Sequence, residues 1–182
     1  MITKLDAVEI AIFGGGCFWC TEATFEMLRG VVSVVPGYAG GTKPNPTYTA
    51  VCNGTTGHAQ VIRVEFDPAI ITFENLLTAF FVVHDPTTLN RQDYDAGTQY
   101  RSIILYTSLE QKNQAENFIK KLEANEYKGE KIVTEVVPLE KFYEAESYHH
   151  QYFKKNPNQA YCQIIINPKV SKLKKQLGQL LK

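Results

Sequence analysis

The chain has 182 residues, of which 44% are hydrophobic, so it is long enough to bury a core and too apolar to be a disordered chain. Its 19 Lys and Arg residues balance its 19 Asp and Glu residues, and this zero net charge gives no sign of nucleic acid or an anionic membrane as a partner. No apolar run is long enough to span a bilayer, and residues 1–13 lack the pattern of a secretory signal.

Hydrophobic periodicity and turn residues predict strands that alternate with helices. In chain order, the expected strands cover residues 8–13, 31–38, 59–66, 100–107 and, at an edge of the sheet, 132–138. The expected helices cover residues 17–28, 72–84 with Thr72 as cap, 108–125 with Ser108 as cap, and 145–155. Residues 46–52 are compatible with one helical turn, and residues 85–97 are expected to form a polar loop. Residues 161–166 are an apolar run, and the basic tail after Pro168 is compatible with a helix.

The first part of the chain therefore reads strand, helix, strand, strand, helix, strand. This is the order of a split βαβ sandwich, in which an antiparallel sheet carries its helices on one face. We expect an α+β fold, a two-layer split βαβ (ferredoxin-like) sandwich with irregular C-terminal extensions. From the length of 182 residues we expect a single domain over residues 1–182. Because heptads are absent and the charge is balanced, we expect a monomer.

The segment GGGCFWC, from Gly14 to Cys20, connects the first expected strand to the first expected helix. Three glycines let the backbone turn tightly and approach a ligand closely, and they place Cys17 at the first turn of the helix. The free N–H groups and the positive end of the helix dipole favour the thiolate, which is the nucleophilic form. Phe18 and Trp19 follow at once and are candidates for a substrate wall, although aromatic residues at a helix start are about as often plain core residues.

Cys17 and Cys20 also form a CxxC pair, which by itself is compatible with a dithiol redox pair or with half of a zinc site. Cys52 and Cys162 stand alone in the sequence, and no second CxxC or His-rich pair completes a set of four ligands. We therefore expect no bound metal. Four cysteines are too few for a disulfide scaffold, which favours a reducing, cytoplasmic setting.

The segment GGGCFWCTEATFE, residues 14–26, resembles the signature of the peptide methionine sulfoxide reductases of the A type. Seven further blocks match that family in its own order: 37–41 (GYAGG), 45–52 (NPTYTAVC), 56–59 (TGHA), 66–68 (FDP), 84–86 (HDP), 97–101 (GTQYR) and 145–152 (AESYHHQY). The resemblance implies a two-layer α+β core and thiol-dependent reduction of methionine S-sulfoxide, free or in a protein, for the repair of oxidised proteins. It implies no bound cofactor.

The resemblance assigns roles around the first helix. Cys17 matches the nucleophile that attacks the sulfoxide sulfur and becomes a sulfenic acid. Phe18 and Trp19 match the residues that hold the methyl group of the substrate in an apolar pocket.

Three further site residues follow from their places in the blocks. Tyr48 and Tyr100 match tyrosines whose hydroxyl groups point at the sulfoxide oxygen, and Asp95 matches an acidic residue that fixes the site through water. Without the blocks, tyrosines at strand edges and an aspartate in a polar loop usually have no chemical role. His58, in the TGHA block, is expected to be a structural hydrogen-bonding residue.

Position 60 departs from the family, which normally has Glu after TGHA as the acid that protonates the sulfoxide oxygen. This chain has Gln60, whose amide donates a hydrogen bond but supplies no proton. The residue is compatible with a natural variant in which Tyr48, Tyr100 or water carries the proton, or with an engineered change. We expect normal substrate binding and slow turnover, with a loss of roughly 10²–10⁴-fold if nothing compensates.

Recycling requires a second thiol, which attacks the sulfenic acid and forms an intramolecular disulfide that a thioredoxin-type dithiol then reduces. The resemblance favours Cys162, in a late segment where some family members carry this thiol, and Cys20 is the local alternative. Cys52 is expected to be a buried packing residue. A general thiol–disulfide oxidoreductase and a zinc-holding interaction module are the rival interpretations, and the first of them leaves Trp19 unexplained.

Overall fold

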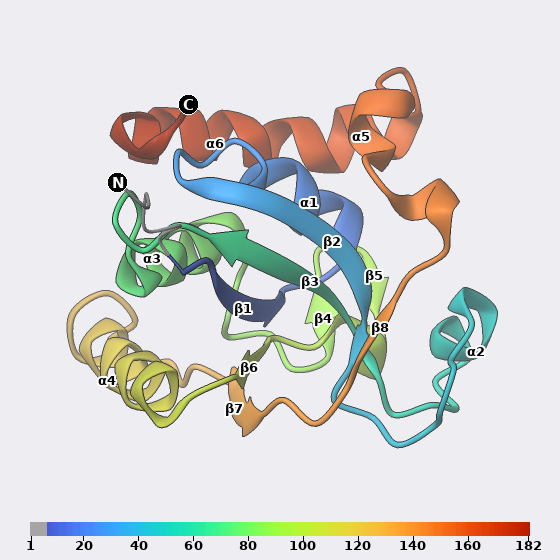
Figure 1. The fold of residues 1–182 in the computed structure, drawn as a ribbon, viewed down its shortest axis with the longest axis horizontal. Coiled ribbons are helices and arrows are strands. Elements are labelled where there is room, and N and C mark those ends of the chain that lie inside the picture. Colours follow the sequence, from blue (N-terminus) through green and yellow to red (C-terminus); the bar gives the residue numbers. More distant parts are fainter. Residues whose placement is uncertain (1–6) are drawn as a thin grey trace, which may run out of the picture.

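The computed structural model describes residues 7–182, and a curled sheet of six strands lies at its centre (Figure 1). In spatial order the strands are β7 (Glu135–Pro138), β6 (Ile103–Tyr106), β1 (Glu9–Gly14), β3 (Ala59–Phe66), β2 (Val31–Ala39) and β8 (Phe142–Glu144). All neighbours pair antiparallel except β7, which runs parallel to β6. The strand predicted at 59–66 is confirmed with the same bounds, and 132–138 is confirmed as an edge, shortened to β7.

Helices α1 (Phe18–Phe25), α3 (Phe73–Val83) and α6 (Asn167–Leu177) pack against one another, and α1 also packs against β2 and β3. Helix α4 (Leu109–Asn125) packs against α3, β6 and β7. The caps expected from the sequence are confirmed: Thr72 forms a capping box with Asn75, and the Ser108 hydroxyl accepts a hydrogen bond from the backbone of Gln111. Among residues 7–182, no helix is long and apolar enough to cross a membrane.

The sheet buries apolar side chains on both faces. The larger core lies between the sheet and helices α1, α3 and α6, with Phe13, Phe66 and Phe80 fully buried in it. A smaller cluster is formed by Ile12, Ala39, Ala59, Val61, Ile103 and Leu105. Strand β3 contributes to both clusters: Val61 lies in the smaller one and Ile62 in the larger one, and in its second half the half-buried Arg63 and Glu65 alternate with buried apolar residues.

Three segments differ from the expected elements. The polar loop at 85–97 contains a small hairpin, β4 (Arg91–Gln92) and β5 (Asp95–Ala96). The apolar run at 161–166 is a π-helix, Cys162–Ile166, which continues directly into α6. The helix predicted over 145–155 is wrong: a short 3₁₀ turn, Ser147–His149, and α5 (Tyr152–Lys155) are separated by Gln151, whose φ is +53°.

Shorter helical pieces complete the fold. These are α2 (Tyr48–Cys52) and the 3₁₀ turns Thr98–Tyr100 and Gly178–Leu180. The predicted turn at 46–52 is thereby confirmed, and the strand predicted to begin at 100 begins at Ile103 because Tyr100 ends a 3₁₀ turn.

Candidate active site

A glycine turn between β1 and α1 places Cys17. Gly16 has a φ of +94°, and a Cβ atom there would come within 2.7 Å of the Gln92 side chain, so both the conformation and the space require glycine. Cys17 is the N-cap of α1, with an extended backbone and a side chain that is 8% exposed. The position predicted for it at the helix start is confirmed, but only the N–H of Trp19 favours its thiolate, because the N–H of Phe18 is bound to Gln60 and that of Cys20 to the Cys17 carbonyl.

Cys17 and Cys20 each affect the ionisation of the other. Burial raises the pKa of Cys17 and the neighbouring Cys20 raises it further, so the expectation that the helix start favours the Cys17 thiolate is wrong for this structure. The neighbouring Cys17 lowers the pKa of Cys20 in spite of its burial. All four cysteines are free thiols. Of the two thiols, Cys20 is therefore the one that ionises more easily.

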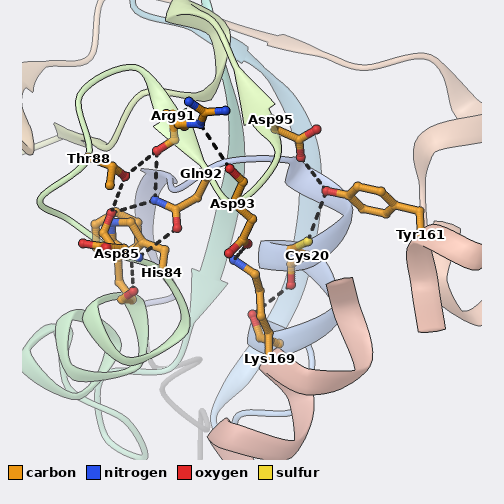
Figure 2. Close-up of polar contacts among 12 residues, drawn as sticks. Cys20, His84, Asp85, Thr88, Arg91, Gln92, Asp93, Asp95, Tyr161 and Lys169 are labelled. Carbon is orange, nitrogen blue, oxygen red and sulfur yellow. Dashed lines mark hydrogen bonds and ion pairs between the residues drawn. The ribbon is translucent and has the colours of Figure 1, made fainter. Parts of the chain in front are cut away.

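Tyr161 connects Cys20 to Asp95 (Figure 2). Its hydroxyl oxygen lies 3.7 Å from the Cys20 sulfur and donates a hydrogen bond of 2.7 Å to Oδ2 of Asp95. Burial, followed by the nearby thiols, raises the pKa of Tyr161 far above its usual range, so the hydroxyl stays protonated. Asp95 is therefore connected to Cys20 through Tyr161, a residue for which no role was expected from the sequence.

Three side chains from the C-terminal part of the chain surround Trp19, and we call them the Trp19 cage: His149, Tyr152 and Tyr161. The indole stacks on Tyr152, with ring centroids 3.7 Å apart and an interplanar angle of 5°, and the Tyr161 ring meets it edge-on at 5.7 Å. The indole N–H donates a hydrogen bond of 3.0 Å to Nδ1 of His149. The cage leaves Trp19 half-buried, whereas Phe18 is fully buried.

Sequence reasoning missed His149 and Tyr152 as site residues. Both lie in the block 145–152, which was noted for its resemblance only, and that block was the one available signal. Their side chains reach Trp19 because the chain breaks its helix at Gln151.

Tyr48 is held at the start of α2 by Glu146. The backbone N–H of Tyr48 donates a hydrogen bond of 3.0 Å to one carboxylate oxygen of Glu146, and the hydroxyl of Tyr38 donates one of 2.9 Å to the other. Burial opposes the ionisation of Glu146, but these hydrogen bonds outweigh it and lower its pKa. Glu146 is therefore an ionised anchor for the helix that carries Tyr48.

The tyrosines expected near the sulfoxide oxygen, Tyr48 and Tyr100, are both half-buried. Burial raises the pKa of both, and the charge of Cys17 contributes in each case. Both hydroxyl groups therefore remain protonated donors. The prediction that Cys52 is buried is wrong, because this residue is only partly buried.

The side chain of Gln60 points to the start of α1. Its Oε1 accepts a hydrogen bond of 3.2 Å from the backbone N–H of Phe18, and the side chain is 1% exposed. A backbone N–H only donates, so the amide oxygen must face Phe18 and the NH₂ group must point elsewhere. That Nε2 has no partner within the described chain. A buried donor without an acceptor is unfavourable by about 1–3 kcal/mol. The Gln60 NH₂ group therefore lacks an acceptor that a bound molecule could supply.

Two further residues singled out in the sequence are Cys162 and His58. Cys162 is fully buried at the first position of the π-helix, where burial and then the neighbouring Cys20 raise its pKa. His58 accepts a hydrogen bond of 3.0 Å from the backbone of Gly41 through Nδ1, and its Nε2 contacts the carbonyl of Lys43 at 2.7 Å. Among residues 7–182, no group of three His, Cys, Asp or Glu side chains is arranged for a metal ion.

The chain is similar to proteins of one family over almost its whole length. A family model described as Peptide methionine sulfoxide reductase matches residues 9–180. Peptide methionine sulfoxide reductase MsrA of Sulfolobus acidocaldarius is 58% identical over 168 residues, which cover 92% of this chain and 94% of the relative. Mxr1 from Saccharomyces cerevisiae in its reduced form superposes with a TM-score of 0.78 at 35% identity, over 85% of this chain and 89% of that chain. Mxr1 in complex with Trx2 superposes with a TM-score of 0.55 at 22% identity, over 84% and 89% of the two chains.

Proposed function

This chain belongs to the peptide methionine sulfoxide reductase family and is an oxidoreductase that reduces methionine sulfoxide with thiols, and from this premise we propose that Cys17 is the attacking thiol. The substrate is methionine S-sulfoxide, free or within a protein. The observation that carries this proposal is the place of Cys17, buried at the N-cap of α1 and in contact with a second thiol.

In the first half-reaction the Cys17 sulfur attacks the sulfoxide sulfur and takes over its oxygen. Methionine leaves, and Cys17 becomes a sulfenic acid. The thiol thereby loses the two electrons that reduce the sulfoxide. The oxygen must accept a proton on the way. Tyr48 and Tyr100 stay protonated and serve as hydrogen-bond donors to that oxygen.

Gln60 takes part through its unpaired NH₂ group. The sulfoxide oxygen is the acceptor that Nε2 lacks, and a hydrogen bond to it would remove the unfavourable burial of this donor. An amide loses no proton at neutral pH, so Gln60 binds and polarises the sulfoxide but leaves its protonation to Tyr48, Tyr100 or water. Substrate binding is then normal and turnover is slow.

The substrate methyl group lies against Trp19 and Phe18. Trp19 keeps part of its surface exposed, and the Trp19 cage fixes its ring from three directions. A rigid, partly exposed indole beside a nucleophile is suited to an apolar methyl group. Asp95 acts on the thiol pair through its hydrogen bond with Tyr161.

Recycling proceeds through two thiols in succession. Cys20, which is in contact with Cys17, attacks the sulfenic acid and releases water, and Cys162 then attacks Cys20, which frees Cys17. The second disulfide joins Cys20 to Cys162. A thioredoxin-type dithiol reduces it, and the complex of the related Mxr1 with Trx2 supports a reductant of this class. The reaction needs no bound cofactor.

The single domain is, in our proposal, a split βαβ (ferredoxin-like) sandwich with extensions. The order β6-β1-β3-β2 with antiparallel neighbours, and the packing of α1 against β2 and β3, support this assignment. Strands β7 and β8 and the segment after β8 are the additions, and that segment supplies the Trp19 cage.

A single-turnover experiment tests the function. Reduced protein is mixed with one equivalent of methionine S-sulfoxide or R-sulfoxide, while Trp19, the only Trp, reports the site by fluorescence and methionine is quantified. We expect one methionine per chain from the S form, none from the R form, and none from Cys17→Ser. Reduction of insulin disulfides without any methionine formation would instead identify a general dithiol oxidoreductase.

A further inference from the structure

A lysine with little access to solvent lies beside Cys20. Lys169 is near the start of α6, which packs against α1, and only 14% of its side chain is exposed. Its Nζ lies 3.0 Å from Oδ2 of Asp93, between β4 and β5. Figure 2 shows the Lys169 side chain extending from α6 past Cys20 to that carboxylate. Because lysines are rarely buried without a partner, Asp93 is the contact that holds the ammonium group in place.

The β4–β5 hairpin holds both ends of the segment that carries Cys162. Before the π-helix, the hydroxyl of Tyr161 is bound to Asp95, and after it, Lys169 is bound to Asp93. Both contacts bring their side chains close to Cys20, Tyr161 as a hydrogen-bond partner and Lys169 as a charge. The hairpin therefore determines the surroundings of this thiol from two directions.

Four side chains from four parts of the fold act on the ionisation of Cys20. Contact with Cys17 lowers its pKa most, and burial opposes this effect. Lys169 and Tyr161 lower the pKa further, whereas the carboxylate of Asp95 raises it. Lys169 is the only cation among these four, so it is the group that compensates a negative charge on the Cys20 sulfur.

We propose that Lys169 is a positioning residue for recycling, whose ammonium group favours the Cys20 thiolate that attacks the Cys17 sulfenic acid. This inference rests on the proposed function. In the step, a bond forms between the sulfurs of Cys20 and Cys17, the S–O bond of Cys17 breaks, and the departing hydroxide takes up a proton and becomes water. The sulfenic acid is the oxidant and the Cys20 thiolate is the reductant, so no further reagent is needed.

The test compares charge-removing and charge-keeping variants in single turnover. Lys169→Gln removes the ammonium group, Lys169→Arg keeps a cation, and Lys175→Gln is the control because Lys175 is exposed on the same helix. After mixing with one equivalent of methionine S-sulfoxide, samples are alkylated at intervals, and the disulfide is quantified by mass spectrometry between pH 6 and pH 10. Methionine is measured in the same samples.

The expected result is a change in the pH profile of disulfide formation. In Lys169→Gln the thiolate fraction of Cys20 below its pKa should fall about tenfold, while the more basic thiolate is about threefold more nucleophilic. Disulfide formation is then about threefold slower near neutral pH and about threefold faster at high pH, so the two profiles cross. The pH profiles of disulfide formation of Lys169→Arg and Lys175→Gln are expected to match that of the wild type.

Two different outcomes distinguish a failure of the proposed function from a failure of the role of Lys169. Wild-type protein that forms no methionine contradicts the proposed function and the inference with it. Normal methionine formation together with superimposable pH profiles for the wild type and Lys169→Gln contradicts the role of Lys169 alone. A merely structural role of the Lys169–Asp93 ion pair produces no crossing of the two profiles.

Discussion

The indole ring of Trp19 lies parallel to the phenol ring of Tyr152, with 3.7 Å between the ring centroids. Trp19 belongs to α1 and comes two residues after the proposed nucleophile, whereas Tyr152 begins α5 near the other end of the chain. This stack joins the first helix to the C-terminal segment. It fixes the ring that is proposed to receive the methyl group of the substrate.

Removing the stacked ring is expected to weaken substrate binding. A stacked aromatic pair contributes about 0.5–1.5 kcal/mol, so Tyr152→Ala should raise the KM for methionine S-sulfoxide about two- to tenfold. Steady-state kinetics measures this effect, and the fluorescence of Trp19 reports the change around the ring. Tyr152→Phe keeps the ring and is the matched control. Equal KM values for Tyr152→Ala and Tyr152→Phe would show that the stack has no part in binding.

Restoring an acid at position 60 is expected to accelerate the chemistry. Gln60→Glu places a protonated carboxyl group where the unpaired amide now points, and general acid catalysis of this kind contributes about 10²–10⁴-fold. Quenched-flow measurement of methionine formation in single turnover reads the rate directly. The gain should vanish at high pH, where the carboxyl group is ionised. An unchanged rate at pH 6 would mean that the proton reaches the oxygen by another route in this chain.

Single substitutions of Cys20 and Cys162, the two thiols proposed for recycling, are expected to stop it at different stages. In Cys162→Ser, one equivalent of sulfoxide should leave a disulfide between Cys17 and Cys20, whereas in Cys20→Ser the sulfenic acid should persist long enough to be trapped by dimedone. Peptide mapping by mass spectrometry distinguishes these products, and Cys52→Ser is the control. Rapid formation of a Cys17–Cys162 disulfide in Cys20→Ser would show that Cys162 resolves the sulfenic acid directly.

The stability of the fold is expected to fall as the pH rises through neutrality, because of Glu22. This side chain is 1% exposed and one of its oxygens has no partner, and burial raises its pKa from 4.5 to about 7. The folded state therefore binds the proton more tightly than the unfolded state. The contribution is complete below pH 4.5 and is lost between pH 4.5 and 7, at most about 3 kcal/mol.

Glu22→Gln, which resembles the protonated acid, should remove this pH dependence. Chemical denaturation at pH 5, 6, 7 and 8 gives the free energy of unfolding of both proteins. The difference between variant and wild type should grow with pH in favour of the variant. Parallel curves over this range would show that Glu22 ionises in the folded protein as easily as in the unfolded chain.

Local signals were sufficient to predict much of the fold. Strand β3 was expected with its observed C-terminal bound because Asp67-Pro68 closes it, and Cys17 was expected at a helix start because three glycines precede it. The segment 145–155 failed for a physical reason. Its residues suit a helix, but Gln151 adopts a left-handed conformation, and His149 and Tyr152 on either side of it contact Trp19. Contacts with a distant helix overrode the local preference.

The arrangement of the site is harder to predict because its contacts are distant in sequence. The resemblance identified Gln60 as a departure, but only the fold shows that its oxygen is used by Phe18 and its NH₂ group is free. Similarly, the sequence gives no reason to connect Tyr161 with Asp95, which lie on different elements and meet beside Cys20. Such pairs depend on how the β4–β5 hairpin and the C-terminal segment pack.

Helix α1 begins at a residue that is poorly suited to begin a helix. The Cys17 side chain makes no capping hydrogen bond, whereas Ser or Thr at this position would accept one from the first turn and stabilise the helix by about 1 kcal/mol. Cys17→Ser, which lacks the proposed nucleophile, is therefore expected to unfold at a higher temperature than the wild type. The proposed nucleophile thus weakens the start of α1, so thermal stability and the reduction of methionine sulfoxide place opposite demands on one side chain.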